Sequence, residues 1–397
     1  MKRNQLGVVR TISIALLVIF GGVLGQTVSA RGRDWQPQRT WVFAVGILQF
    51  QHKDMFDSFP QKNRRDAQLI EFFRQQGVPE SQIVFLKDSQ ATAQRVENAF
   101  TTFLSKAGPD DLLFFYYTGH GYKSEDEKTT YFATYDTSED VDGLATETLV
   151  NDIERYFKGS RALLTADTCF SGGLAQQTRQ SGRRVSYATL ASATSNHTST
   201  ENWTFTEMLL AGLRGKSFAD INGDGEVTLS ELAQDIKDDM AFAEDQKSVF
   251  VTTANFQPEM ELAVAERKTD PLISSRLEVH SEGDWYKARI IEARNGSYRV
   301  HYFGYEDSDD EWVTRRQFRL PNSANIARDS RAGINGRGQS TEYRVGANVE
   351  VNWHGKWYAA KILEAKDSRH LVHYDGYDDS WDEWVPDNRI RRPSWNN

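Results

Sequence analysis

The chain has 397 residues, more than one hydrophobic core usually supports, which excludes a single small domain and favours two or three. With 39% hydrophobic and 26% charged residues, the composition is that of a globular protein and excludes a fibrous or fully disordered chain. A formal net charge of -9 argues against non-specific nucleic-acid binding, which needs clustered Lys and Arg, so we expect no nucleic acid among the partners.

The N-terminus has the pattern of a signal peptide. Basic residues precede an apolar stretch at 12–24, and the small residues Val28 and Ala30 follow it. We therefore expect residues 1–30 to be removed after Ala30 and the protein to be exported, to the periplasm or the outside. An uncleaved membrane anchor is the alternative, although the apolar stretch is shorter than the ~20 residues that a span needs.

Residues 38–265 alternate short β-rich runs with helical patterns, which predicts an α/β domain with a mostly parallel sheet flanked by helices. The expected strands are 41–50, 83–88, 111–121, 161–169, 185–194 and 248–256. The clearest helical patterns are 63–77 and 92–108, the second ending at a Gly-Pro stop.

Cys169 is the only cysteine, so it cannot form a disulfide within the chain even in an oxidising compartment. It ends one predicted strand in "ADTCFSGG", and His120 ends another in "YYTGHG". Groups that follow parallel strands meet at the same edge of a sheet, where an imidazole could activate the thiol as a nucleophile. The alternative reading is a small buried cysteine and an unrelated loop histidine.

The two motifs "TGHG" and "DTCFSGG", 49 residues apart from His to Cys, resemble those of the caspase and metacaspase superfamily of cysteine peptidases. The resemblance implies a caspase-haemoglobinase-like fold, with His120 as general base and acid and Cys169 as nucleophile. It places the oxyanion hole at the amides of Gly121 and Cys169, and Asp167 at the floor of the specificity pocket. A polypeptide substrate cleaved after Arg or Lys is then expected, with no cofactor for catalysis.

Two further expectations depend on this resemblance. The loop "AQQTRQSGRRVS" corresponds to the processing loop of the family, so Arg179, Arg183 and Arg184 are candidates for self-cleavage, a merely solvated basic loop being the alternative. Phe170 stands where metacaspases commonly have His, which leaves the neighbouring subsite open. A degenerate, catalytically inactive scaffold or binding protein is the alternative function.

The stretch "DINGDGEVTLSE" at 220–231 fits the EF-hand loop at each ligand position, with Gly225 at the sharp turn. The expected Ca²⁺ ligands are Asp220, Asn222, Asp224, the Glu226 carbonyl, Thr228 and Glu231. Helical patterns flank the loop, but no second EF-hand loop pairs with it. An acidic helix connection that binds no metal is therefore the alternative.

The tail contains a repeat at an offset of 72 residues: "WYKARIIEA" recurs as "WYAAKILEA", "VHYFGY" as "VHYDGY", and "DEWV" unchanged. It predicts small SH3-like β-barrels at 273–320 and 343–393, joined by a flexible linker at 321–342 that is rich in Gly, Ser, Asn and Arg.

Both modules resemble chromo-barrel, or Tudor-knot, domains, whose aromatic cage binds a methylated ammonium group. In the second module the matching positions are Tyr358, Tyr374, Tyr377 and Trp381, and in the first they are Tyr286, Tyr302, Tyr305 and Asp309. The second module is therefore the better candidate for a cationic or methylated ligand. The alternative is that these aromatics, like Trp312, only fill the barrel cores.

Overall fold

The computed structural model describes residues 35–391, except positions 181, 198, 200–201, 254, 282, 322–342, 344, 354–355, 367–368, 376–381 and 387–388. The predicted signal peptide and most of the predicted linker lie outside the described residues. Within the described part of the chain, no helix is both long enough and apolar enough to cross a membrane.

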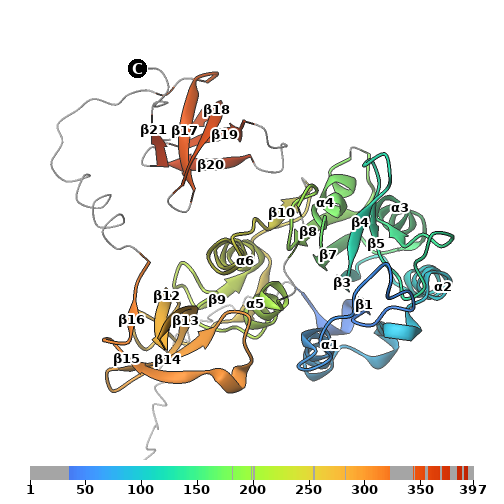
Figure 1. Cartoon of the computed structure of the whole chain (residues 1–397). Coiled ribbons are helices and arrows are strands. Elements are labelled where there is room, and N and C mark those ends of the chain that lie inside the picture. The colour runs from blue at the N-terminus through green and yellow to red at the C-terminus, as the bar shows by residue number, and fades with distance from the viewer. Residues whose placement is uncertain are drawn as a thin grey trace, which may run out of the picture. The chain divides into compact units, whose positions relative to one another are not determined.

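A six-stranded sheet forms the centre of residues 35–265, here called the sheet domain, in the order β10-β8-β7-β3-β1-β2 (Figure 1). Its strands are β1 (Thr40–Gly46), β2 (Ile83–Lys87), β3 (Leu112–Thr118), β7 (Arg161–Asp167), β8 (Ser186–Ala191) and β10 (Val249–Thr252). All neighbours are parallel except the β10–β8 pair. The predicted mostly parallel sheet is thus confirmed.

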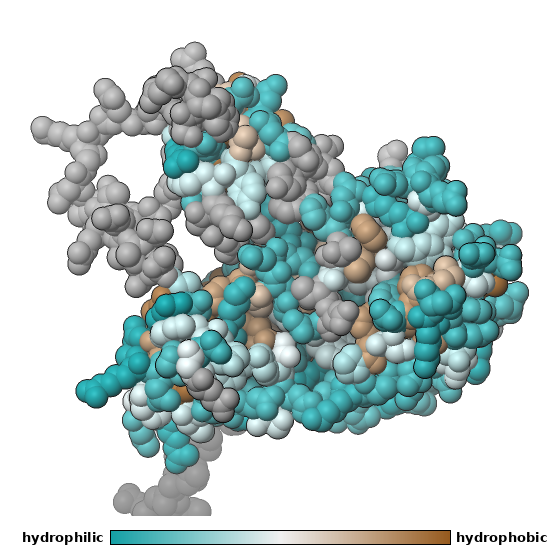
Figure 2. Space-filling view, in the orientation of Figure 1, coloured by the Kyte–Doolittle hydropathy of each residue, from teal (hydrophilic) through white to brown (hydrophobic). Residues whose placement is uncertain are grey.

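Helices cover both faces of this sheet, which explains the unbroken apolar runs of its strands. All seven residues of β3 are buried. The helices are α1 (Arg65–Gln75), α2 (Ala93–Leu104), α3 (Thr146–Tyr156), α4 (Gly172–Thr178), α5 (Thr204–Leu213) and α6 (Leu229–Glu244). One core contains residues of α1, α5 and α6, and the other contains residues of α2, α3 and α4. The face seen in Figure 2 is largely hydrophilic, with small separate apolar patches.

Two small sheets accompany the central one. The strands β4 (Gly121–Lys123), β5 (Thr130–Phe132) and β6 (Leu144–Ala145) form an antiparallel sheet directly after the end of β3. The strands β9 (Glu226–Thr228) and β11 (Glu261–Val264) pair beside the start of α6. The first of these sheets therefore begins directly after His120, and the second contains residues 226–228 of the predicted calcium loop.

The tail forms two five-stranded antiparallel sheets of the same order, β15-β14-β13-β12-β16 and β20-β19-β18-β17-β21. We call them the first and the second barrel. The first contains β12 (Arg276–Ser281), β13 (Asp284–Arg294), β14 (Ser297–Tyr302), β15 (Glu311–Thr314) and β16 (Phe318–Arg319). The second contains β17 (Asn348–Trp353), β18 (Lys356–Lys366), β19 (Arg369–Tyr374), β20 (Glu383–Pro386) and β21 (Ile390–Arg391).

The two barrels match strand for strand at the offset of 72 residues, and both have an irregularity at the same place, between Ile290 and Glu292 and between Ile362 and Glu364. The predicted repeat of two small β modules is thus confirmed. Trp312 does not fill a barrel core, because its side chain is 44% exposed, but two of the cage tyrosines, Tyr302 and Tyr374, do belong to the barrel cores.

The first barrel packs directly on the sheet domain. Phe303, which follows β14, belongs to the core that α1, α5 and α6 share, and its ring lies 6.0 Å from that of Phe242. Arg289 is fully buried and binds the carboxylates of Asp235 and Asp239 on α6. The first barrel is therefore joined to the sheet domain by both apolar packing and buried ion pairs.

Candidate active site

The strand register brings His120 and Cys169 to the same edge of the sheet. Thr118 at the end of β3 pairs with Asp167 at the end of β7, and the two candidate residues each follow two positions later. The loops after these strands are joined by a hydrogen bond, in which the Thr168 hydroxyl donates to the Gly119 carbonyl at 2.8 Å. Both His120 and Cys169 are partly buried and line one cavity.

The loop that follows β1 holds the His120 ring. Its Nε2 is 2.8 Å from the backbone oxygen of Asp57, and the rings of Phe50, Phe56 and Phe59 lie 4.4 to 5.3 Å from the imidazole. A carbonyl oxygen can only accept, so in the neutral ring the proton is on Nε2 and the lone pair is on Nδ1. This fixes a tautomer in which Nδ1 can take a proton. Sequence reasoning missed Asp57, because a backbone carbonyl has no residue signature.

A backbone amide supports the Cys169 sulfur. The N–H of Ser199 donates to Sγ at 3.2 Å, and the Ser199 hydroxyl is in turn held by the side chains of Ser192 and Gln246. This N–H donor favours the thiolate, which is the nucleophilic form, whereas the Ser199 carbonyl, 3.8 Å from Sγ, accepts from the protonated thiol. This support was also missed, since Ser199 lies 30 residues after the cysteine.

Gly121 has the surroundings that an oxyanion-hole residue needs. A Cβ at this position would come 2.1 Å from the Cys169 carbonyl oxygen, so no other residue fits so closely. His120 and Ala133 lie opposite one another, and the Ala133 N–H donates to the His120 carbonyl. Gly121 is therefore at a non-hydrogen-bonded position, and its N–H points away from β5. A substrate oxygen could accept from it.

Asp167 lines the same cavity and is 7% exposed. Its carboxylate accepts a hydrogen bond of 2.6 Å from the Thr206 hydroxyl. Burial raises the pKa of the Asp167 carboxyl to about 7, although the Thr206 bond opposes the shift. A buried carboxyl group with no cation beside it is costly to ionise. A cation that enters the cavity would stabilise the carboxylate, so the site is suited to bind a cation.

The cavity has a volume of about 350 Å³, in the range of small-ligand sites. From the sheet domain it is lined by Leu48, Phe59, Thr118, Gly119, His120, Asp167, Cys169, Ser199 and Glu207, among others. Three consecutive residues of the first barrel, Gly304, Tyr305 and Glu306, complete the lining. Nothing in the sequence places the barrel here, because its position depends on tertiary contacts between residues that are far apart in the chain.

The candidate self-cleavage residues differ in their surroundings. Arg179 ends α4 and is exposed. The Arg183 guanidinium donates to Asn151 and Gln180, while that of Arg184 donates to backbone carbonyls next to α3. Of the three, Arg179 is the one whose side chain is available to enter another site.

The predicted calcium loop is folded around its own side chains. Asp220 accepts from the N–H of Gly225 at 3.1 Å, and Glu231 accepts from the N–H of Asn222 at 3.1 Å. Glu231 also forms a capping box with Thr228 at the start of α6. Two further expected ligands also bond within the loop: the Asp224 carboxylate accepts from the Glu226 amide, and the Asn222 side-chain oxygen accepts from the Asp224 amide. The loop thus has the turn that the motif predicts, and calcium binding itself stays a prediction.

In place of a second EF-hand loop, β11 pairs with β9 of the loop. Among the described residues, only Glu207, His301 and Asp307 place three ligating atoms of His, Cys, Asp or Glu within 4.8 Å of one another. The carboxylates of the calcium loop lie farther apart than this. A cation at the loop would therefore have to draw its carboxylates together.

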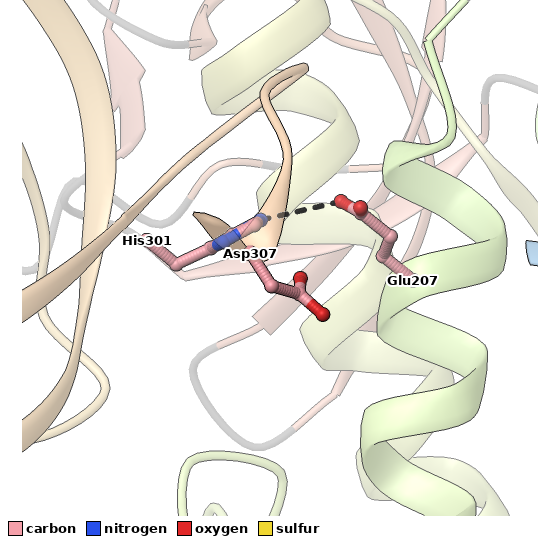
Figure 3. A group of neighbouring side chains, drawn as sticks. All are labelled: Glu207, His301 and Asp307. Carbon is pink, nitrogen blue, oxygen red and sulfur yellow. Dashed lines mark hydrogen bonds and ion pairs between the residues drawn. The ribbon is translucent and has the colours of Figure 1, made fainter. Parts of the chain in front are cut away.

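Figure 3 shows that Glu207 comes from α5, while His301 and Asp307 come from the first barrel. Arg65 binds both carboxylates. Although burial opposes it, hydrogen bonds to Asp310 and Glu207 raise the pKa of His301 to about 9. The Arg65 guanidinium neutralises both carboxylates and His301 pairs with Glu207, so the cluster is an ion-pair network in this structure.

The aromatic positions of the first barrel form three walls. The rings of Tyr286, Tyr302 and Tyr305 lie 5.9 to 6.1 Å apart at steep angles to one another. Asp309 provides no fourth wall and instead caps a short 3-10 helix, with its carboxylate accepting from the Glu306 amide. Tyr305 is 47% exposed, so its ring is accessible.

In the second barrel the rings of Tyr358 and Tyr374 lie 6.2 Å apart and perpendicular, and Tyr377 and Trp381 lie outside the described residues. The ammonium of Lys247, which follows α6, is 4.2 Å from the centroid of the Tyr374 ring. Burial lowers the pKa of Lys247 to about 7. One predicted cage ring thus faces a cationic side chain of the chain itself.

Comparison with known proteins gives two family matches. Residues 47–277, more than half of the chain, match the family described as the caspase domain. Residues 343–392 match the Tudor-knot family, described as the RNA binding activity-knot of a chromodomain. None of the curated proteins matches the chain.

Two solved structures are similar to parts of the chain. The crystal structure of a protein from Geobacter sulfurreducens is 15% identical, covers 57% of this chain and 100% of its own, and has a TM-score of 0.43. The crystal structure of the tandem Agenet domain 3-4 of ADCP1 is 15% identical, covers 31% of this chain and 81% of its own, and has a TM-score of 0.13. The family assignment therefore depends on the two sequence matches.

Proposed function

The chain belongs to the caspase-domain family of cysteine peptidases, and from this premise we propose that it is an exported endopeptidase that cleaves polypeptides after Arg or Lys. The observation that carries the proposal is the register of β3 and β7, which brings His120 and Cys169 into one cavity with Asp167. The N-terminal sequence pattern supports export.

The proposed reaction follows from the geometry of the pair. Nδ1 of His120 takes the thiol proton, and the thiolate attacks the carbonyl carbon of the scissile bond. The amides of Gly121 and Cys169 donate to the oxygen that becomes negative. The imidazolium then gives its proton to the leaving amine, which leaves a thioester on Cys169. Water, deprotonated by His120, hydrolyses the thioester and restores the free enzyme.

Asp167 is proposed to select the residue before the scissile bond. A Lys or Arg side chain entering the cavity would pair with this buried carboxylate, and the pair would restore the charge that burial disfavours. An acidic side chain there would meet a like charge. The same specificity makes Arg179 the preferred candidate for self-cleavage, because its side chain is exposed, whereas the guanidinium groups of Arg183 and Arg184 are hydrogen-bonded within the protein.

Calcium is proposed to order the segment between α5 and α6. The loop carries the EF-hand ligand types at the required spacing, and its turn is already formed by hydrogen bonds to Asp220 and Glu231. No step of the reaction uses the ion. The barrels are proposed to bind a cationic or methylated group on the target, which would raise the local substrate concentration.

The proposal is tested with residues 31–397, comparing the wild type with Cys169→Ala and Cys169→Ser on fluorogenic peptides that end in Arg, Lys or Asp. The wild type should cleave the Arg and Lys peptides, and both variants should lose activity by roughly 10⁴-fold. Parallel reactions with calcium and with chelator test the role of the ion. No cleavage of any peptide would favour the scaffold function.

A further inference from the structure

A turn of the first barrel forms part of the candidate active site. Gly304, Tyr305 and Glu306 line the cavity that also contains Cys169 and His120. No other part of either barrel borders this cavity within the described residues. The first barrel is thus part of the candidate active site, because one wall of the cavity would be missing without it.

Close packing and ion pairs hold the turn in position. Phe303 before it is buried in the core of the sheet domain, and Asp307 after it binds Arg65 at 2.7 Å. Gly304 has a φ of +82°, and a Cβ there would lie 3.1 Å from the Asn202 side chain, so the turn both requires a left-handed residue and lies against the sheet domain. The turn Gly304–Glu306, called the wall below, is therefore held by Phe303 on one side and Asp307 on the other.

The wall offers two groups that attract a cation. The Tyr305 ring is 47% exposed and stands at steep angles to two other tyrosine rings. The Glu306 carboxylate binds Lys62 at 2.8 Å, and this hydrogen bond lowers the pKa of Glu306, so the group is ionised. Lys62 is 76% exposed, so its pair with Glu306 is a surface pair that another cation can replace at little cost.

We propose that Tyr305 and Glu306 of the first barrel form a subsite of the active-site cavity, which binds a second basic side chain of the polypeptide substrate. Asp167 lies deep in the same cavity and takes the first basic side chain. The Tyr305 ring takes the second through cation-π attraction, with the Glu306 carboxylate beside it. The peptidase accordingly prefers segments with two basic residues near the scissile bond. This subsite rests on the proposed function for its substrate, but its preference for cations can be measured without cleavage.

Because Cys169 is the only cysteine, a thiol reagent reports on this cavity alone. The reagents are methyl methanethiosulfonate, which is neutral, and its trimethylammonium-ethyl analogue, which is cationic. In each the thiolate displaces methanesulfinate and forms a mixed disulfide. The intrinsic difference in reactivity between the two reagents is the same for every variant, so a change in the ratio of the two rates reports on recognition of the cation. The ratio of the cationic to the neutral rate therefore measures cation binding in the cavity, normalised for thiol reactivity.

Tyr305→Leu and Glu306→Gln should each lower this ratio by roughly two- to fivefold, whereas Tyr305→Phe keeps the ring and should keep the ratio. The matched control is Trp312→Leu, which removes an aromatic side chain of the same barrel that is 44% exposed and does not line the cavity. An unchanged ratio in Tyr305→Leu, or an equal fall in the control, would overturn the proposal.

Peptide cleavage separates this inference from the proposed function. Tyr305→Leu should lower kcat/KM for peptides with two adjacent basic residues by a larger factor than kcat/KM for peptides with one. If no peptide is cleaved but the labelling ratio falls as expected, the cation subsite stands and the peptidase proposal fails. If one-basic peptides are cleaved and the ratio is unchanged, the subsite fails and the peptidase proposal stands.

Discussion

At the scale of single residues, the Asp167 carboxylate suits the proposed binding of a basic side chain but lowers the stability of the free protein. Its carboxyl is buried beside the candidate nucleophile, and burial raises its pKa to about 7. The folded protein binds this proton more tightly than the unfolded chain does, so stability falls as the pH rises from about 4, the ordinary pKa of Asp, to about 7. Above pH 7 the carboxylate is ionised in a buried site, which lowers the stability of the protein until a cation binds in the cavity.

Asp167→Asn should therefore raise the melting temperature much more at pH 8 than at pH 5, because at pH 5 only the unfolded wild-type chain has lost this proton. The gain at pH 8 is at most roughly 4 kcal/mol, at about 1.4 kcal/mol for each unit of the pKa shift. The same variant should lose cleavage after Arg and Lys. Scanning calorimetry at both pH values checks the prediction, and a lower melting temperature at pH 8 would contradict it.

At the scale of elements, the calcium loop joins α5, which carries Glu207 of the cavity, to α6, which binds the first barrel. The Glu231 carboxylate both belongs to the loop and caps α6. An ion that orders the loop would therefore stabilise both helices, and with them one side of the candidate site.

Glu231→Gln should abolish the rise in melting temperature that millimolar calcium gives the wild type, since calcium prefers a bidentate carboxylate at this position. Glu226→Gln is the control, because the EF-hand pattern uses only the backbone carbonyl of that residue. A calcium-induced rise that persists in Glu231→Gln, or one that is missing from the wild type, would show that the loop binds no calcium.

Prediction from the sequence was most successful where a period or a repeat was present. All six strands of the central sheet were anticipated from their apolar runs, and the barrels from the offset of 72 residues. What could not be anticipated depends on tertiary contacts: the Asp57 carbonyl on His120, the Ser199 amide on Cys169, and Tyr305 in the cavity. Backbone N–H and carbonyl groups, and surface residues far away in the chain, leave no pattern in a single sequence.

At the scale of the whole molecule, the two barrels have diverged at the positions that face the sheet domain. Arg289 of the first barrel is fully buried against Asp235 and Asp239, whereas Lys361, its equivalent in the second barrel, is exposed. The same strand position thus binds the sheet domain in the first barrel and contacts solvent in the second. The first barrel and the sheet domain should accordingly unfold as one unit.

Arg289→Met should destabilise the protein by up to about 3–5 kcal/mol, because it removes the fully buried guanidinium from Asp235 and Asp239 and leaves only the partly exposed Arg276 to neutralise both carboxylates. The equivalent change Lys361→Met should alter the free energy of unfolding by no more than about 0.5 kcal/mol. Urea denaturation of both variants measures the difference. Equal effects would mean that the buried ion pairs do not hold the first barrel.

Alkaline pH should loosen the same interface. Because the pKa of His301 is raised to about 9, its ion pairs stabilise the folded protein fully below pH 6.5, and the stabilisation is lost as the pH rises through 9. Between pH 7 and 10 the wild type should therefore lose more stability than His301→Gln, which has no such charge. Parallel pH–stability curves for the two proteins would contradict the assignment.

The most direct test of the central claim is the mass of the intact protein after treatment with peptidyl chloromethyl ketones that end in Arg or in Asp. If Cys169 is an active nucleophile and Asp167 binds the basic side chain, the thiolate should displace chloride from the Arg reagent. The protein should then gain the mass of one inhibitor without its chloride, and peptide mapping should locate the label on Cys169. The Asp reagent should react far more slowly. No labelling by either reagent, or equal labelling by both, would contradict a His120–Cys169 peptidase specific for basic residues.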